Sequence, residues 1–183
     1  MDKQLHDVTP GQQSRAFAAW YGVQVGLCWT ASFGLFMWGL QQPFASNFSL
    51  LVGLASVPLA VWLLRGFRRD IAPLSLRRAW HMAWLLFLCA AMITTAAQYI
   101  YFAYLDGGLL ARAYSELLTS PEYRPLLQQM LPGQDIDALA TDMTDMLAQT
   151  TPSQLTMQLA FGNVLLATIL AIPTALFSFK SEK

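Results

Sequence analysis

The feature that most constrains this chain is a long stretch without charge. No Asp, Glu, Lys or Arg occurs between Arg15 and Arg65. One bilayer crossing takes about 20 apolar residues, so this stretch suits two crossings rather than one. Backbone groups in hydrocarbon must pair within the protein, and long apolar runs without polar alternation exclude a closed barrel. The sequence therefore predicts an all-α, polytopic membrane protein.

The composition agrees with this fold class. Of 183 residues, 55% are hydrophobic and only 12% are charged, against roughly a quarter charged in an average soluble domain. A disordered chain or a nucleic-acid-binding protein would need many more charges. We therefore expect membrane lipids, and no nucleic acid, among the partners.

We predict a single membrane domain over residues 1–183 with four transmembrane helices. Their expected ranges are 16–40, 48–64, 79–105 and 153–179. Turn formers and polar residues at 41–47 separate the first two ranges. The fourth is preceded by Thr151-Pro152-Ser153-Gln154, which resembles an N-cap followed by proline and then by Gln three residues after the cap.

The charges predict an orientation by the positive-inside rule. Only Arg112 and Arg124 lie in the predicted outer segment, which also carries seven acids. The other nine of the 11 basic residues lie on one side of the membrane: Lys3, Arg15, Arg65, Arg68, Arg69, Arg77, Arg78, Lys180 and Lys183. Both termini are therefore predicted to be cytoplasmic, and residues 106–152 extracytoplasmic.

The outer segment is predicted to be a helical insertion between the third and fourth spans. We expect residues 109–118 to continue the third helix, a short helix to run from Ser120-Pro121 to about Met130, and a last helix to cover 135–149. The apolar stripe of the last helix would pack on its neighbours or lie on the membrane surface; the alternative is a docking face for a partner protein.

The sequence predicts no catalytic, cofactor-binding or metal-binding residues, and the protein is not expected to be an enzyme. The acids Asp135, Asp137, Asp142 and Asp145 fail the spacing of an EF-hand and are explained as solvated helix-face charges. Cys28 and Cys89 fall near mid-membrane, where a thiol behaves as a small apolar group.

Small residues recur every four positions along the first predicted helix: Ala18, Gly22, Gly26, Thr30 and Gly34. This stripe includes a GxxxG pattern, which allows two helices to approach closely. It predicts packing against another span of the same chain; homodimerisation or packing on a separate membrane subunit is the alternative.

Two polar side chains are predicted at mid-depth, Gln24 in the first helix and Asn163 in the fourth. At about 1.5 Å per residue they reach similar depths from opposite faces. We predict that they lie close in space and form a hydrogen bond with each other.

Five arginines surround a single acid in the predicted cytoplasmic loop: Arg65, Arg68, Arg69, Arg77 and Arg78. Such a cluster attracts anionic lipid headgroups, at about 1 kcal/mol per charge. It is explained either by positive-inside anchoring or by recognition of a phosphate-bearing lipid through forked guanidinium contacts.

Several of these features together resemble a known family. They are the four spans, the segment Phe67-Arg68-Arg69-Asp70 before Leu74-Ser75, the exit Tyr99-Ile100-Tyr101-Phe102 followed by Asp106-Gly107, and Asn163 in the last helix. The chain thus resembles the domain of unknown function 4199 family. The resemblance implies a small bacterial inner-membrane protein without established activity, from a family whose genes often lie near that of a polyprenyl-phosphate type glycosyltransferase.

Two functions follow as hypotheses. The first is a non-enzymatic accessory or scaffold subunit for a membrane partner, with a lipid-linked glycosyltransferase as the candidate. The alternative is a lipid-handling protein or small transporter that uses Gln24, Gln98 and Asn163 as a polar path. Because four short spans rarely enclose a lumen, this alternative calls for a homo-oligomer.

Overall fold

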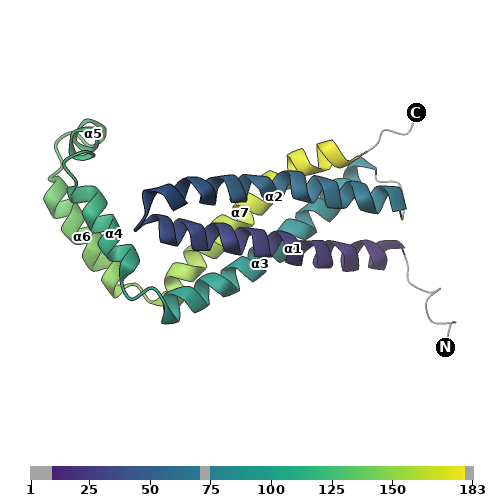
Figure 1. The fold of residues 1–183 in the computed structure, drawn as a ribbon, viewed down its shortest axis with the longest axis horizontal. Helices are drawn as coiled ribbons and strands as arrows, with labels where there is room; N and C mark the ends of the chain where they lie inside the picture. The colour runs from purple at the N-terminus through teal and green to yellow at the C-terminus, as the bar shows by residue number, and fades with distance from the viewer. Residues whose placement is uncertain (1–9, 71–74, 180–183) are drawn as a thin grey trace.

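The regular elements of the computed structural model are all helices over the residues it describes, 10–70 and 75–179 (Figure 1). Seven helices follow one another along the chain: α1 (Pro10–Gly39), α2 (Pro43–Asp70), α3 (Leu76–Tyr104), α4 (Leu109–Thr119), α5 (Arg124–Met130), α6 (Ile136–Gln149) and α7 (Pro152–Ser178). The predicted all-α fold is confirmed. Lys3, Lys180 and Lys183, used above to predict orientation, lie outside the described residues.

The four long helices form a bundle with a defined packing order. α1 packs against α2 and α3, and α7 packs against α3 and α2, so α1 and α7 occupy diagonal positions. α1 begins and α7 ends at one end of the bundle, here called the base, while α4, α5 and α6 lie beyond the opposite or far end (Figure 1). The core between the long helices is built from large side chains such as Leu64, Phe67, Met82, Leu86 and Phe87.

Three of the four long helices are long and apolar enough to cross a membrane. They are α2, over Phe44–Arg69, together with α3 and α7. The first predicted span, residues 16–40, is helical but is not among them. Its uncharged part contains several glycines and polar residues, Gln24 and Ser32 among them, which lower its mean hydropathy.

The connection between α1 and α2 is tighter than predicted. Residues 44–47 belong to α2, which begins at Pro43, because proline suits the first turn of a helix. Gly39 makes this turn possible, since a Cβ built on it would lie 2.6 Å from Ser46 N. The expected polar turn over 41–47 is therefore wrong in its second half.

The chain changes direction after α3, so residues 109–118 do not continue that helix as predicted. Gly107 and Gly108 have φ angles of 52° and 77°, which L side chains rarely adopt. The Asp106 carboxylate accepts hydrogen bonds from Gly108 N (3.0 Å) and Leu110 N (3.2 Å). This turn directs α4 across the far end of the bundle (Figure 1).

Helices α4 and α6 lie side by side and bury Leu118, Ile136 and Ala140. The predicted start of α5 at Ser120-Pro121 is wrong, because residues 121–123 form a turn and α5 begins at Arg124. α6 is N-capped by Asp135, whose side chain accepts from Asp137 N and Ala138 N. The predicted cap of α7 is confirmed as a capping box of Thr151 and Gln154.

Candidate functional site

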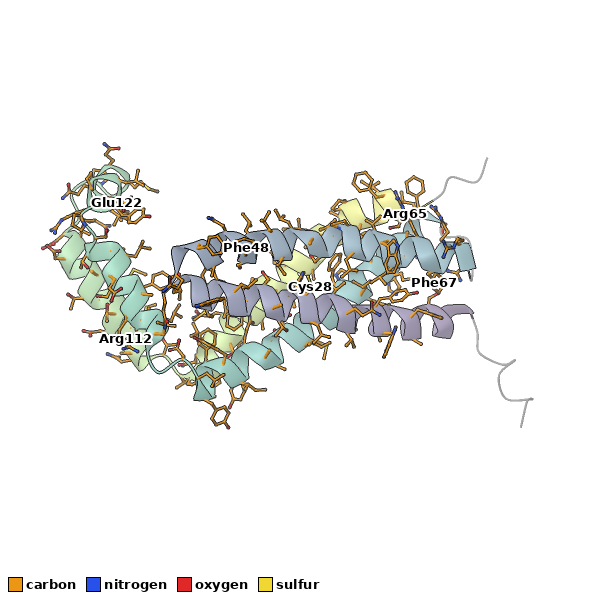
Figure 2. All side chains as sticks on the ribbon, in the orientation of Figure 1. Cys28, Phe48, Arg65, Phe67, Arg112 and Glu122 are labelled. Carbon is orange, nitrogen blue, oxygen red and sulfur yellow. The ribbon has the colours of Figure 1, made fainter. Side chains whose placement is uncertain are left out.

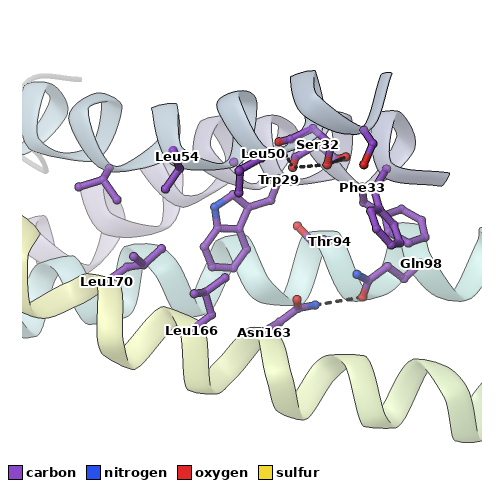
Figure 3. A pocket seen from close by; sticks show the side chains of 15 residues that line it. Trp29, Ser32, Phe33, Leu50, Leu54, Thr94, Gln98, Asn163, Leu166 and Leu170 are labelled. Carbon is purple, nitrogen blue, oxygen red and sulfur yellow. Dashed lines mark hydrogen bonds between the residues drawn. The ribbon is translucent and has the colours of Figure 1, made fainter. Parts of the chain in front are cut away.

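A cavity of about 550 Å³ lies among the four long helices. Its volume falls in the range of small-molecule sites. The exposed side chains of Leu50 and Leu54 on α2 and of Leu166 on α7 contribute to its lining, so the cavity is open between α2 and α7. Figure 3 shows α2 and α7 on its two sides, with the Trp29 indole between them.

Hydrogen bonds join α2 to α7 only near the base, within the described residues. Arg65 Nε donates to Phe177 O at 3.0 Å. Arg68 Nη1 donates to Ser178 O at 2.8 Å and to Phe179 O at 3.1 Å. A cation at carbonyls that end a helix is favoured by the helix dipole. This attachment fastens the two helices at one end and leaves the cavity between them nearer the far end.

A pair of serines forms the wall between α1 and α2. Ser32 Oγ donates to Ser49 O, and Ser49 Oγ donates to Ser32 O, both at 2.8 Å. Because each hydroxyl donates to the backbone of the other helix, the pair fixes the register of α1 against α2. These hydrogen bonds supply a neutral polar wall for the cavity.

The floor of the cavity carries an amide cluster between α3 and α7. Asn163 Nδ2 donates to Gln98 Oε1 at 3.0 Å and to Thr95 Oγ1 at 3.2 Å (Figure 3). Thr94 Oγ1 donates to Gly26 O at 3.3 Å and so links α3 to α1. Gln98 is only 5% exposed and Thr94 only 2%. The cluster is therefore held in place from three helices.

The predicted hydrogen bond between Gln24 and Asn163 is wrong. Asn163 faces α3, whereas Gln24 lines a second cavity, of about 530 Å³, together with Tyr21, Trp62 and Arg65. Depth in the bundle is not sufficient for contact, because α1 and α7 are diagonal to each other. Gln98, which the sequence analysis placed only on a polar path, is the true partner of Asn163.

Asn163→Leu is expected to lower the free energy of unfolding by about 1 kcal/mol, because it leaves Gln98 Oε1 buried without its donor. The double variant Gln98→Leu/Asn163→Leu should recover much of this loss, since both partners are then apolar. Unfolding in mixed micelles, followed by circular dichroism, measures all three. A double variant less stable than Asn163→Leu would contradict this account of the cluster.

The small-residue stripe of α1 packs within the chain, as predicted, over its first half. A Cβ built on Gly22 would lie 2.5 Å from Cys89 Cβ and 2.7 Å from Leu86 O. A Cβ built on Gly26 would lie 3.1 Å from Ala90 Cα. Ala18 is fully buried. Gly22 and Gly26 therefore lie against α3, and all three residues are covered within the chain.

The second half of the stripe does not continue this packing. Thr30 Oγ1 donates to Gly26 O within α1, and a Cβ on Gly34 would meet nothing within 4 Å. Gly39 and Gly53, which the four-residue spacing does not include, approach α2 and α1 instead. A Cβ on Gly53 would lie 3.2 Å from Ser32 Oγ.

Of the five predicted headgroup-binding arginines, two have a structural role. Arg65 and Arg68 bind carbonyls at the end of α7, as described above. Arg69 lines the second cavity, while Arg77 and Arg78 lie in the first turn of α3. Arg65 and Arg68 line the second cavity together with Arg69, so the structure brings three of the five to one site and leaves Arg77 and Arg78 outside its lining.

Trp29 is a cavity residue that no sequence pattern predicted. It is 6% exposed, it stacks on Phe87 with ring centroids 5.8 Å apart, and it lines the cavity. Its spacing of three residues from Ser32 places both on one face of α1. Among the described residues, no group of three or more His, Cys, Asp or Glu side chains could hold a metal ion.

Comparison with known families settles where this chain belongs. A family of proteins of unknown function, DUF4199, matches residues 20–180. The chain is a member of the DUF4199 family. The match covers all four long helices from Trp20 onward and both cavities, so the cavities lie within the region that defines the family. No curated protein matches the chain, and no solved structure matches it.

Proposed function

We propose that this DUF4199 protein crosses the bacterial inner membrane four times, with α1 joining α2, α3 and α7. The support for α1 is its freedom from charge after Arg15 and its packing against two apolar helices. The positive-inside rule places the base in the cytoplasm, because five arginines lie near it. The helices α4–α6 then lie on the outer surface, as an insertion between the third and fourth spans.

A cysteine introduced at Gln128 in α5 should react with a membrane-impermeant maleimide in intact cells. Gln128 is exposed on the extracytoplasmic side of the proposed topology. The test uses a Cys28→Ala/Cys89→Ala background, because the native thiols are the only two in the chain. Arg77→Cys at the base is the control and should react only after lysis. The reverse pattern would overturn the topology.

Within this placement, we propose that the protein binds a lipid in the cavity between α2 and α7. The observation that carries the proposal is an open cavity of about 550 Å³ with a polar floor inside an apolar bundle. Its opening is bordered by exposed leucines of two helices that would face acyl chains. The cavity lies within one chain, so binding in it does not require the homo-oligomer that four short spans were expected to need. The proposed role is to bind the lipid without catalysing a reaction on it and without a cofactor.

Purification in mild detergent followed by native mass spectrometry tests this proposal. The expected result is a protein that retains about one lipid of defined mass after exchange into a second detergent. A protein that carries no lipid, or a mixture matching the bulk membrane, would contradict it.

The same eluate tests the accessory-subunit hypothesis, which one observation favours. Tyr114 and Leu117 on α4, and Met146 on α6, are exposed although they are apolar. We propose these exposed side chains as docking positions for a membrane partner, because Gly22 and Gly26 already pack against α3. A stoichiometric membrane enzyme that is lost from the eluate on Leu117→Glu would support an accessory role. Unchanged recovery would count against docking at these positions.

Anionic headgroups are the proposed ligands of the base. The second cavity combines Gln24, Trp62 and Arg69, which suit the polar and aromatic environment of a membrane interface. Phospholipid selectivity in the same native spectra, with and without Arg69→Gln, measures this contribution.

A further inference from the structure

The cavity between α2 and α7 is lined by no titratable side chain. Its neutral polar groups come from serines, Thr94, Gln98, Asn163 and Trp29, and the rest of its lining is apolar. Burying an ionised group without a charged partner is costly. The lining therefore disfavours a ligand that places a phosphate, carboxylate or ammonium group in this cavity.

Two hydrogen-bond donors in the cavity lining have no partner among the described residues. Gln98 uses its Oε1 to accept from Asn163, and its Nε2 donates to no acceptor among the described residues. The indole N–H of Trp29 is likewise without an acceptor in that part of the chain. Both side chains are more than nine-tenths buried, at 5% and 6% exposure. The two donor nitrogens themselves are not among the fully buried atoms without a partner, so they stay accessible from the cavity that both residues line, and a ligand there can accept from them.

These donors are held rigidly and point to one kind of ligand group. Gln98 is fixed by Asn163, which is itself fixed by Thr95. Trp29 is fixed by stacking on Phe87. Both residues line the cavity, from α1 and α3, at separate places: Figure 3 shows the Gln98 amide beside Asn163 and the Trp29 indole nitrogen on the side of the ring nearer Leu54. A ligand that supplies uncharged oxygen acceptors would satisfy both donors.

We infer that the cavity selects an uncharged amphiphile whose hydroxyl or ester oxygens accept hydrogen bonds from Gln98 Nε2 and Trp29 Nε1, as a neutral glycerolipid or a long-chain alcohol does. This inference rests on the proposed lipid-binding function and names its ligand class. The acyl chain lies along Leu50, Leu54 and Leu166 toward the opening between α2 and α7.

The test compares three probes of similar chain length on the purified full-length protein by native mass spectrometry. The probes are 1-monooleoylglycerol, which has neutral oxygens; oleyl sulfate, which is permanently charged; and 1-octadecene, which has no acceptor. At equal mole fraction in the micelles, the first should bind about tenfold better than either of the others, as one or two neutral hydrogen bonds would give.

Two variants assign this preference to the donors. Gln98→Leu is close in size and leaves Asn163 Nδ2 bonded to Thr95, while Trp29→Phe keeps an aromatic ring against Phe87. Each should lose most of the preference for monooleoylglycerol over octadecene and still bind octadecene. Should one variant fail to fold, the other decides.

The outcomes separate the two proposals. Equal binding of oleyl sulfate and monooleoylglycerol, or an unchanged preference in both variants, would overturn the ligand class while lipid binding stands. Absence of binding by all three probes to the wild-type protein would overturn the lipid-binding function and the ligand class together.

Discussion

Replacing Gly22 by alanine is expected to cost about 3 kcal/mol of stability and to remove most of the folded protein. The added methyl would lie 2.5 Å from Cys89 Cβ and 2.7 Å from the carbonyl oxygen of Leu86. Neither atom is at the end of a flexible side chain, so α1 and α3 must move apart. Overpacking of this kind costs about 1–3 kcal/mol and occasionally more.

Gly34→Ala is the matched control for this prediction. It makes the same change in the same helix, but its Cβ would meet nothing within 4 Å. Because alanine favours helix by about 1 kcal/mol over glycine, this variant should be as stable as the wild type or slightly more so. Size-exclusion profiles and thermal unfolding in detergent measure both variants. Equal behaviour of the two would show that the α1–α3 contact is looser than described.

Leu166→Trp is expected to reduce the lipid retained by the protein about tenfold. Leu166 lies on the cavity side of α7, and Figure 3 shows its side chain directed toward Trp29. A second indole at this position would occupy space that the lipid is proposed to fill. Its backbone stays in α7, and the exposed position should tolerate the larger ring without loss of the fold.

The neighbouring position supplies the control. Leu165 is also exposed on α7 but is not part of the cavity lining, so Leu165→Trp should retain lipid as the wild type does. Native mass spectrometry counts the bound lipid, and the unfolding temperature checks the fold. Equal retention by the two variants would place the lipid elsewhere on the protein.

The sequence was sufficient to predict the helices and one of the contacts between them. Charge-free stretches define where a chain can lie in hydrocarbon. The four-residue spacing of Ala18, Gly22 and Gly26 predicts a close helix contact, and Gly22 and Gly26 lie against α3. Local capping chemistry is equally visible, and the Thr151–Gln154 capping box was predicted from four residues.

The sequence was not sufficient to predict the order in which the helices pack. Periodicity shows which face of a helix is buried but not which helix covers it, so Gln24 and Asn163 were paired across a diagonal. Residues 109–118 were predicted to continue the third helix, because the sequence alone does not show that Gly107 and Gly108 adopt the left-handed conformations that reorient α4. The cavity lies between α2 and α7, whose hydrogen bonds to each other are at the base, and no local pattern encodes that arrangement.

The central claim is that a lipid occupies the cavity between α2 and α7, and site-specific photo-crosslinking tests it most directly. Leu50 and Leu51 are adjacent and exposed on α2, but only Leu50 lines the cavity. Figure 2 shows the side chains along α2, and Figure 3 shows Leu50 at the cavity. A benzophenone amino acid at each position would be irradiated after purification in detergent. The account predicts a lipid adduct at Leu50 and detergent adducts at Leu51. Equal lipid adducts at the two positions, or none at Leu50, would contradict it.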